Sequence, residues 1–284
     1  MYYKIENEFY TASVDDMGAQ LHSFCSKQGE EYLWQGNPDI WYGQAPVLFP
    51  FIGQLKNDKF IYNGKEYSCP KHGLARKLLF KVKSIEDSKV VFSLESDENT
   101  LKQYPFEFEL LIAYELCGRK LKATHTVINK TDGKMYFSIG AHPGFNCEIG
   151  DVIEFEKAET LETQRIDSEN LIIEQKFPVL DDSKEIVITK ELFDNDALIL
   201  SGIESEKLSI VSKNLGRKLE FVFGKAPYLG IWAKPAAPYV CIEPWYGVND
   251  SHEDYGEVSN KVGIQSLEAG ESFEFSWTAE VVSL

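Results

Sequence analysis

The sequence contains no long hydrophobic run, which argues against a membrane-spanning protein. A transmembrane helix needs about 18 or more consecutive apolar residues, and no stretch of this chain approaches that length. The N-terminal segment also lacks the basic stretch and apolar core that mark a secretory signal peptide. We therefore expect neither a membrane span nor a cleaved signal.

Positive charge is scarce in this chain. The sequence has 29 Lys and Arg residues against 45 Asp and Glu residues, a formal net charge of −16. A protein that binds nucleic acid neutralises phosphates with a basic surface, and an anionic membrane would repel so acidic a chain. We expect no nucleic-acid partner and no membrane partner. A phosphorylated substrate would need a local basic pocket.

Cysteine is also sparse, and its spacing gives no metal or redox motif. The five cysteines are an odd number, and none forms a Cys-X-X-Cys pair: Cys25, Cys69, Cys117, Cys147 and Cys241. Zinc ribbons and thioredoxin-like sites are therefore not indicated. A reducing cytoplasm is the simplest location for such a chain. We predict no metal site and no cofactor.

Alternation of apolar and polar residues is the dominant pattern that is present. It is typical of antiparallel strands with one buried face. Apolar side chains from Phe106 to Leu116 share one face, and glutamates lie on the other: Glu107, Glu109 and Glu115. Similar runs occur at 90–94, 219–223 and 273–277. The 284 residues, 43% of them hydrophobic, are enough for a sizeable core.

Turn signals are common and helix signals are few. The pairs Asn63-Gly64 and Asp132-Gly133 suit the tight primed turns of β-hairpins, which need positive φ. Segments 97–103 and 189–193 are long enough for about one helical turn each. Long helices between strands are absent from the pattern, so a parallel βαβ fold is not expected. We predict one all-β domain over residues 1–284, with long loops that carry the function.

Three segments contain the residues that are candidates for catalysis. His72 lies in Lys-His-Gly-Leu-Ala-Arg, and His142 lies in Ala-His-Pro-Gly-Phe, so each imidazole stands beside glycine or proline after a strand-like run. Such places let a ligand approach closely. Glu243 interrupts an apolar strand ending in Cys-Ile-Glu-Pro-Trp. Partial burial there would raise the pKa of its carboxyl toward that of a useful base.

Each of these residues also has an ordinary structural interpretation. A histidine can be a satisfied polar residue, and Glu243 can be a buried ion-pair partner. His125 alternates with Leu121, Ala123 and Val127, so we predict a packed strand residue. His22 and His252 have no supporting context, and we expect them on the surface or in loops.

Four motifs in order closely resemble the aldose 1-epimerase (galactose mutarotase-like) family, and its LacX-type branch in particular. They are Ala-Pro-Val-Leu-Phe-Pro-Phe-Ile-Gly-Gln-Leu at 45–55, Lys-His-Gly-Leu-Ala-Arg at 71–76, Gly-Ala-His-Pro-Gly-Phe at 140–145, and Cys-Ile-Glu-Pro-Trp at 241–245. The resemblance covers almost the whole chain. It implies the family's fold, a large antiparallel β-sandwich sometimes called a supersandwich, which agrees with the alternation.

The resemblance also implies catalytic roles. By its match to the family's His-Pro motif, His142 would be the general acid at the sugar ring oxygen. Glu243 would be the general base that takes the proton from the anomeric hydroxyl. His72, in the His-Gly motif, would bind and orient the ring. Mutarotation needs one group to remove a proton while another supplies one, and neither step requires a metal or redox cofactor.

Several further residues are candidates for binding the sugar. Related proteins often have arginine where this chain has Gln54, so a neutral amide stands in place of a charged guanidinium group. The family also uses an aspartate for sugar hydroxyls, and Asp196 is the best match, with Asp194 as runner-up. Trp232 and Phe145 are candidates for stacking on the sugar, although an aromatic residue in a β protein is more often part of the core.

Three basic residues lie near the motifs: Lys71, Arg76 and Lys234. They suit a phosphate if the substrate is a sugar phosphate, and ordinary surface charge is the interpretation that we favour from sequence. Arg76 is retained as a candidate substrate-binding residue.

The sequence thus predicts an isomerase, an aldose 1-epimerase acting on galactose, glucose or a related hexose. Two alternatives stay open: a noncatalytic sugar-binding or regulatory protein on the same scaffold, favoured by Gln54, and a sugar-phosphate 1-epimerase. Glycoside hydrolysis lacks a convincing second acid, because neither Asp196 nor Asp250 sits in a comparable strand-end setting. We expect a cytoplasmic monomer or homodimer with a small sugar as its partner.

Overall fold

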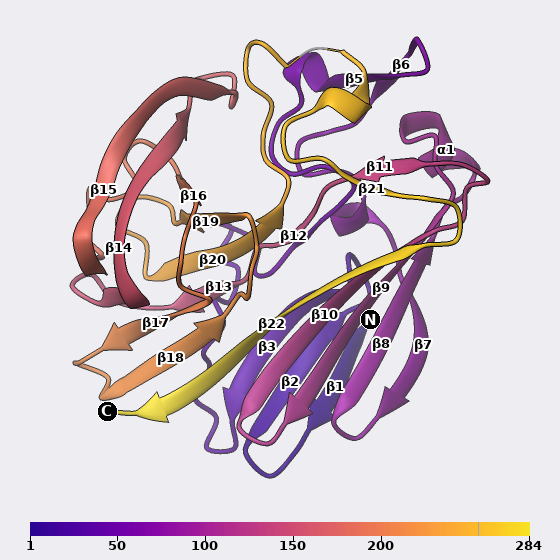
Figure 1. Ribbon diagram of the computed structural model, residues 1–284. Helices are drawn as coiled ribbons and strands as arrows, with labels where there is room; N and C mark the ends of the chain where they lie inside the picture. Colours follow the sequence, from indigo (N-terminus) through magenta and orange to yellow (C-terminus); the bar gives the residue numbers. More distant parts are fainter. Residues whose placement is uncertain (255) are drawn as a thin grey trace.

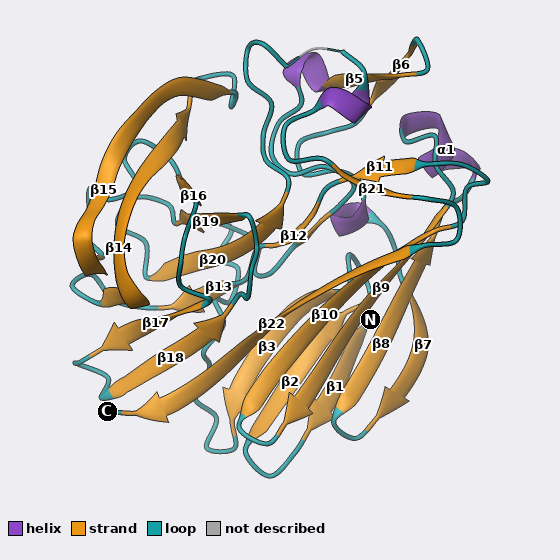
Figure 2. Ribbon diagram, viewed as in Figure 1, coloured by secondary structure: helices purple, strands orange, loops and turns teal. Residues whose placement is uncertain are grey.

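Antiparallel β-strands form almost the whole protein in the computed structural model, which describes residues 1–254 and 256–284 (Figures 1 and 2). The described helices are short: α1 (Glu98–Gln103) and three 3₁₀ turns, η1 (Lys56–Asp58), η2 (Ala75–Lys77) and η3 (Val258–Asn260). The predicted all-β, antiparallel sandwich is therefore confirmed. No helix in the described part of the chain has the length and apolar character needed to cross a membrane.

One large antiparallel sheet runs through the molecule. Its strands follow one another in the order β4 (Val47–Leu48), β12 (Ile139–Ala141), β20 (Tyr239–Tyr246), β19 (Tyr228–Trp232), β16 (Leu198–Ser201), β14 (Val152–Ile166), β17 (Lys207–Ser212), β18 (Arg217–Val222), β22 (Ser272–Ser283), β10 (Lys120–Asn129), β9 (Phe108–Cys117), β8 (Lys89–Glu95) and β7 (Lys81–Glu86). Off this path, β13 (Gly144–Asn146) pairs with β20, and β15 (Ile172–Val187) pairs with β14.

A second sheet covers one end of the large sheet and closes the core there. It contains β1 (Tyr2–Glu6), β2 (Tyr10–Asp15) and β3 (Gln20–Ser26), and Figure 1 shows these strands alongside β8, β9, β10 and β22. The Tyr3 and Phe92 rings meet edge to face with centroids 5.5 Å apart. The Tyr114 hydroxyl donates a hydrogen bond to the carbonyl of Ala19 at 3.0 Å. Aromatic packing thus joins the two layers.

The predicted strand alternation is confirmed in β9, with one deviation. Its apolar side chains are buried in turn, and they pack into the core as expected: Phe108, Leu110, Ile112, Tyr114 and Leu116. Glu109, expected on the solvent face, is buried instead. It pairs with Lys83 at 2.6 Å and Lys130 at 3.4 Å, so neighbouring lysines cover the carboxylate and neutralise it.

Of the two predicted hairpins, one is confirmed and one is wrong. Asn63 and Gly64 both have positive φ and join β5 (Lys59–Tyr62) to β6 (Lys65–Ser68). Asp132-Gly133 makes no such hairpin, because the next strand, β11 (Met135–Phe137), pairs with β21 (Gln265–Leu267). The Asn129 amide donates to the carbonyls of Gly133, Leu267 and Glu268, which directs the chain toward that distant partner.

The two predicted helical turns also differ in outcome. The first is α1, where Asp97 accepts hydrogen bonds from the backbone of Asn99 and Thr100 in a capping box. Residues 190–195 form consecutive turns and no helix. Arg165, on β14, donates hydrogen bonds to the carbonyls of Asn195, Asp196 and Ala197 where these turns end.

The strands β14 and β15 form a long, curved hairpin that reaches past the sheet (Figure 1). Four register shifts interrupt their pairing, and such irregularities bend and twist a strand pair. Residues 167–171 form the hairpin tip. The Asn249 amide donates to the carbonyl of Asn170 at 2.9 Å, so the tip lies against the loop that follows β20.

Candidate active site

His142 and Glu243 meet where two prolines interrupt a strand pair. In the pairing of β13 with β20, Gly144 faces Cys241, and the same register places His142 opposite Glu243. Pro143 and Pro244 lack backbone N–H groups, so the ladder of hydrogen bonds is broken at this point. The imidazole Nε2 of His142 lies 3.3 Å from a carboxylate oxygen of Glu243.

A cavity of about 370 Å³ opens beside this pair. It is lined by Trp41, Pro46, Lys71, His72, Arg76, His142, Ile166, Asn170, Asp196, Ala197, Ile199, Trp232, Lys234, Glu243, Trp245 and Asn249. Its walls come from loops and strand ends far apart in sequence, and its volume suits a small-molecule ligand. All three residues that the sequence singled out, His72, His142 and Glu243, face this one cavity.

A left-handed backbone turn positions His72. His72 has φ of 65° and Gly73 has φ of 74°, and a Cβ at Gly73 would lie 2.2 Å from the carbonyl oxygen of Phe49. The backbone N–H of Gly53 donates to Nδ1 of His72 at 3.1 Å. Because Nδ1 accepts, the neutral ring carries its hydrogen on Nε2 and offers a donor. Burial first, then nearby positive charge, holds the pKa of His72 well below its usual value.

The protonation of the His142–Glu243 pair follows from its burial. Glu243 is 1% exposed, and desolvation raises the pKa of its carboxyl well above the usual value. The indole N–H of Trp245 donates to the same carboxylate oxygen at 3.2 Å and only partly opposes that effect. Desolvation lowers the pKa of His142 to about 3. Burial therefore favours the uncharged form of each partner, the protonated carboxyl and the neutral imidazole.

Two tryptophans surround the ring of His142. Trp41 stacks on it with centroids 5.1 Å apart and an interplanar angle of 28°, and Trp232 meets it edge to face at 5.6 Å. Trp232 thus lines the cavity, in agreement with its candidacy, although its sugar contact stays a prediction. Sequence reasoning missed Trp41, because it lies in a loop outside every strand pattern. Its nearness to the 45–55 motif was the only available signal.

The charged candidates also reach the cavity. Asp196 lines it, is exposed, and has φ of 63°, whereas Asp194 is not among the lining residues. Arg76 donates to the backbone carbonyl of Lys71 at 2.9 Å. The Lys71 ammonium donates to the side chain of Asn170 at 2.6 Å.

The basic residues therefore line the cavity instead of being scattered on the surface. Lys234 lies over the ring of Trp232, 5.9 Å from its centroid. Among the described residues, no carboxylate lies within ion-pair distance of Lys71, Arg76 or Lys234. The preference for ordinary surface charge that the sequence suggested does not fit this placement.

Two predicted binding residues do not reach the cavity. The Gln54 amide donates to Asp58 at 2.5 Å and to the carbonyl of Leu55 at 3.0 Å, so it is directed toward the η1 turn. Phe145 is fully buried and packs against Phe221 with centroids 5.7 Å apart. Because alternate strand residues face opposite sides, Phe145 points into the core while Gly144 faces Cys241 and the site.

The hairpin tip supplies lining residues that the sequence gave no reason to expect. Ile166 is the last residue of β14, Asn170 lies in the tip, and Asn249 faces them from the loop after β20. A Cβ at Gly53 would lie 1.9 Å from Asn249, so glycine makes room for this amide. Sequence alone could not show that these segments meet, because the pairing is long-range.

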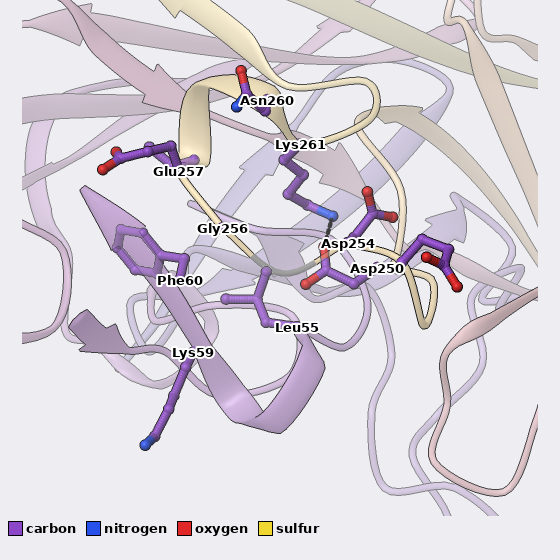
Figure 3. Close-up of a pocket in the computed structure, with 11 residues that line it drawn as sticks. Leu55, Lys59, Phe60, Asp250, Asp254, Gly256, Glu257, Asn260 and Lys261 are labelled. Carbon is purple, nitrogen blue, oxygen red and sulfur yellow. Dashed lines mark hydrogen bonds and ion pairs between the residues drawn. The ribbon is translucent and has the colours of Figure 1, made fainter. Parts of the chain in front are cut away.

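A second, smaller cavity of about 130 Å³ lies between β5 and residues 250–254 and 256–261 (Figure 3). Its central contact is a buried ion pair between Asp250 and Lys261. Asp250 also accepts a hydrogen bond from the backbone N–H of Lys56 at 2.8 Å. Asp250 is thus engaged away from Glu243 and lines the smaller cavity only. It holds the loop that carries Asn249.

The three remaining histidines lie outside the cavity. His125 is 1% exposed and stacks on Phe275 with centroids 4.6 Å apart, which confirms a packed strand residue. His22 lies on β3, partly buried, 2.7 Å from the Gln44 side chain. His252 is a loop residue that pairs with Asp167 at 2.5 Å.

No resident metal is assigned to the site. Of the described residues, His142, Cys241 and Glu243 have possible ligand atoms within 4.8 Å of one another. Burial raises the pKa of the Cys241 thiol well above its usual value, and a protonated thiol is a poor ligand. Nε2 of His142 is already engaged with Glu243.

Comparisons with known proteins agree with this fold. The family model described as aldose 1-epimerase matches residues 1–276. The chain therefore belongs to the aldose 1-epimerase family. It is 32% identical to the plasmid-encoded protein LacX of Lactococcus lactis subsp. lactis over 280 residues, which is 93% of this chain and 94% of LacX.

Two solved structures are closely similar. A galactose mutarotase related enzyme from Lactobacillus acidophilus is 33% identical, with a TM-score of 0.95 over 100% of this chain and 98% of that one. A galactose mutarotase-like protein from Lactobacillus casei is 28% identical, with a TM-score of 0.94 over 99% and 100%. The galactose mutarotase-like fold predicted from sequence is thereby confirmed.

Proposed function

We propose that this protein is an aldose 1-epimerase that interconverts the α and β anomers of a hexose such as galactose or glucose. The contact between His142 and Glu243 in a cavity of ligand size is the observation that carries the proposal. A protein that only binds sugar needs hydrogen-bonding groups but has no need for a buried pair of an imidazole and a carboxyl group.

The reaction uses the two groups in turn. Glu243, as carboxylate, removes the proton from the O1 hydroxyl, the bond between C1 and the ring oxygen breaks, and the ring oxygen takes a proton from the imidazolium of His142. The free aldehyde turns about the C1–C2 bond. Closure on the other face returns the proton from Glu243 to O1 and the ring-oxygen proton to His142, so the enzyme is unchanged.

Burial is compatible with this chemistry because His142 and Glu243 together hold the same number of protons in both states. The imidazolium–carboxylate state that opens the ring has the same net charge as the neutral pair. The proton is on His142 in the first state and on Glu243 in the second, and the two groups are 3.3 Å apart. Burial favours the neutral state, which is the state that the pair reaches when the sugar is open. The pair can therefore alternate between acid and base roles without charging the cavity.

The other candidates bind and orient the ring in this proposal. His72 offers a fixed Nε2–H donor, because its Nδ1 accepts from Gly53. Asp196 accepts hydrogen bonds from sugar hydroxyls at the exposed rim. Trp232 covers one face of the sugar. Gln54 and Phe145 act only indirectly, through the η1 turn and the core.

The test is the approach of freshly dissolved α-D-galactose and α-D-glucose to anomeric equilibrium, followed by polarimetry with and without protein. We expect acceleration by the wild type. Glu243→Gln should lose about 10²–10⁴-fold in rate while keeping its fold. Glu107→Gln, a change of the same kind at an exposed position just before β9, should keep full activity. Near-normal turnover by folded Glu243→Gln would refute Glu243 as the base.

A phosphorylated hexose is a second candidate substrate, and the basic residues favour it. Lys71, Arg76 and Lys234 line the cavity of a protein whose net charge is −16. A comparison of glucose with glucose 6-phosphate in the same assay decides between the two. A large preference in kcat/KM for glucose 6-phosphate would indicate that these three residues bind the phosphate group. Equal rates would indicate that they contribute little to substrate choice.

A noncatalytic sugar-binding or regulatory role is the alternative that the same assay excludes or supports. Binding of galactose without acceleration of mutarotation would favour it. We further propose a cytoplasmic location, consistent with the free cysteines of the described residues, and a monomer or homodimer. Cell fractionation and light scattering after size exclusion test these two points.

A further inference from the structure

The imidazole of His142 lacks the hydrogen bond that usually orients a catalytic histidine. A catalytic or ligating histidine is ordinarily held by a hydrogen bond at its second ring nitrogen, from a carboxylate or a carbonyl. In His142, Nε2 faces Glu243, and Nδ1 is buried without a hydrogen-bond partner among the described residues. No neighbouring residue in the described part of the chain therefore holds Nδ1, and packing contributes to the position of the ring.

An aromatic row provides that packing. Trp41 stacks on His142 on one side and on Tyr239 on the other, with centroids 5.1 and 5.3 Å apart, and Tyr239 stacks on Trp34 at 4.7 Å. The indole N–H of Trp34 donates to the backbone carbonyl of Trp41 at 2.8 Å. The row thus connects the ring of His142 to the buried core.

Two glycines leave room for the indole of Trp41. A Cβ at Gly144 would lie 3.0 Å from the indole, and a Cβ at Gly43 would lie 2.6 Å from it. Gly144 is two residues from His142 on the same face of the sheet. The indole therefore rests on the bare backbone beside the imidazole, where a side chain would displace it.

We propose that Trp41 is a positioning residue for His142: its indole face fixes the plane of the imidazole against Glu243 and stabilises the imidazolium. The inference rests on the proposed epimerase function for its kinetic consequence. The attraction between a cation and an indole face strengthens when water is excluded, as it is here. Trp41 thereby favours the charged state of His142 that burial alone disfavours.

Other charged and titratable groups act on the same ring. Glu243 faces it from β20 and favours the imidazolium when it is a carboxylate, with the Cys241 thiol beside it. His72 approaches edge to face at 6.0 Å, and Lys71 and Arg76 disfavour the imidazolium through their charge. Trp232, on β19, stands nearly perpendicular to the imidazole, so Trp41 is the ring that stacks on the imidazole plane among the described aromatic residues.

Stepwise fluorination of the tryptophan at position 41 tests the proposal without changing its shape. Fluorine withdraws electron density from the indole face, so the imidazolium should become less stable with each substituent. We expect kcat to fall about tenfold across the series at pH 7, with little change in KM. The pKa of His142, followed by ¹⁵N NMR of the imidazole, should move downward in parallel. The same series at Trp277, a buried core residue on β22, should change neither quantity.

The outcomes separate this inference from the proposed function. If the wild type accelerates mutarotation and fluorination at position 41 changes neither kcat nor the His142 titration, the inference is wrong. If KM rises while kcat is constant, Trp41 is a sugar platform, and the inference is again wrong. If no sugar is turned over by the wild type, the proposed function fails, and the His142 titration still decides whether Trp41 stabilises the imidazolium.

Discussion

At the residue scale, burial sets the behaviour of the titratable groups. His142, His72 and Glu243 were identified from glycine and proline context and from family motifs, and all three line the cavity. Gln54 and Phe145 came from the same motifs but do not reach it. A motif gives the backbone position of a residue, and only the local φ/ψ and strand parity decide where its side chain points. Trp41 shows the converse, since no periodic pattern marks a loop residue.

The buried His125 predicts a specific loss of stability in acid. Desolvation lowers its pKa to about 3 in the folded protein, against an ordinary value near 6.5. Below pH 6.5 the unfolded chain binds a proton that the folded protein does not, so the free energy of unfolding falls as the pH drops toward 3. At ~1.4 kcal/mol per pKa unit, the full effect is roughly 5 kcal/mol.

Replacing His125 with leucine should therefore flatten the acid side of the stability profile. His125 stacks on Phe275 and has a buried Nδ1 without a partner, so an apolar side chain suits the site. Urea unfolding of His125→Leu and wild type at pH 7, 5 and 4 measures the difference. We expect the variant to gain relative to the wild type as the pH falls. A constant difference across these pH values would contradict the prediction.

At the scale of elements, local chemistry decides strands and turns, and long-range pairing decides the rest. The alternating runs gave β8, β9, β18 and β22, and Asn63-Gly64 gave the turn between β5 and β6. Asp132-Gly133 failed because β11 pairs with β21, more than a hundred residues away. The curved β14–β15 hairpin was equally beyond local reasoning, because its tip is placed by contacts such as Asn249 to Asn170.

Two glycines with the same backbone conformation should respond differently to alanine. Gly64 has φ of 72° and open space where a Cβ would stand, so Gly64→Ala should cost only the left-handed penalty of roughly 1–2 kcal/mol. Gly73 has φ of 74°, but its Cβ would lie 2.2 Å from a backbone oxygen.

Gly73→Ala should therefore lose clearly more unfolding free energy than Gly64→Ala, and it should also displace the adjacent His72. Denaturant unfolding of both variants measures the first effect, and the sugar assay measures the second. Equal losses of stability in the two variants would contradict the prediction and would show that the backbone at Phe49 can shift to relieve the clash.

At the scale of the whole molecule, one C-terminal strand joins the two halves of the large sheet. β22 pairs with β18 on one side and with β10 on the other. The strands that build the cavity lie beyond β18, and those that pack on β1–β3 lie beyond β10. This continuity supports our proposal that residues 1–284 form one domain.

A single cooperative transition is the expected consequence. Near-ultraviolet circular dichroism and tryptophan fluorescence should give coincident unfolding curves in urea. A chain that ends at Leu267, without β22, should not fold, because β18 and β10 would both lose a partner. Two separate transitions, or a folded product from the shortened chain, would instead divide the protein into independent units.

The aromatic lining of the cavity has a practical consequence. Three of the five tryptophans, Trp41, Trp232 and Trp245, face the space that the substrate would occupy. Their emission depends on contact with water and on nearby proton donors, and a bound sugar would change both. The protein therefore carries an intrinsic optical reporter of occupancy. Titration with unlabelled sugars can rank ligands by affinity even for those that are never turned over.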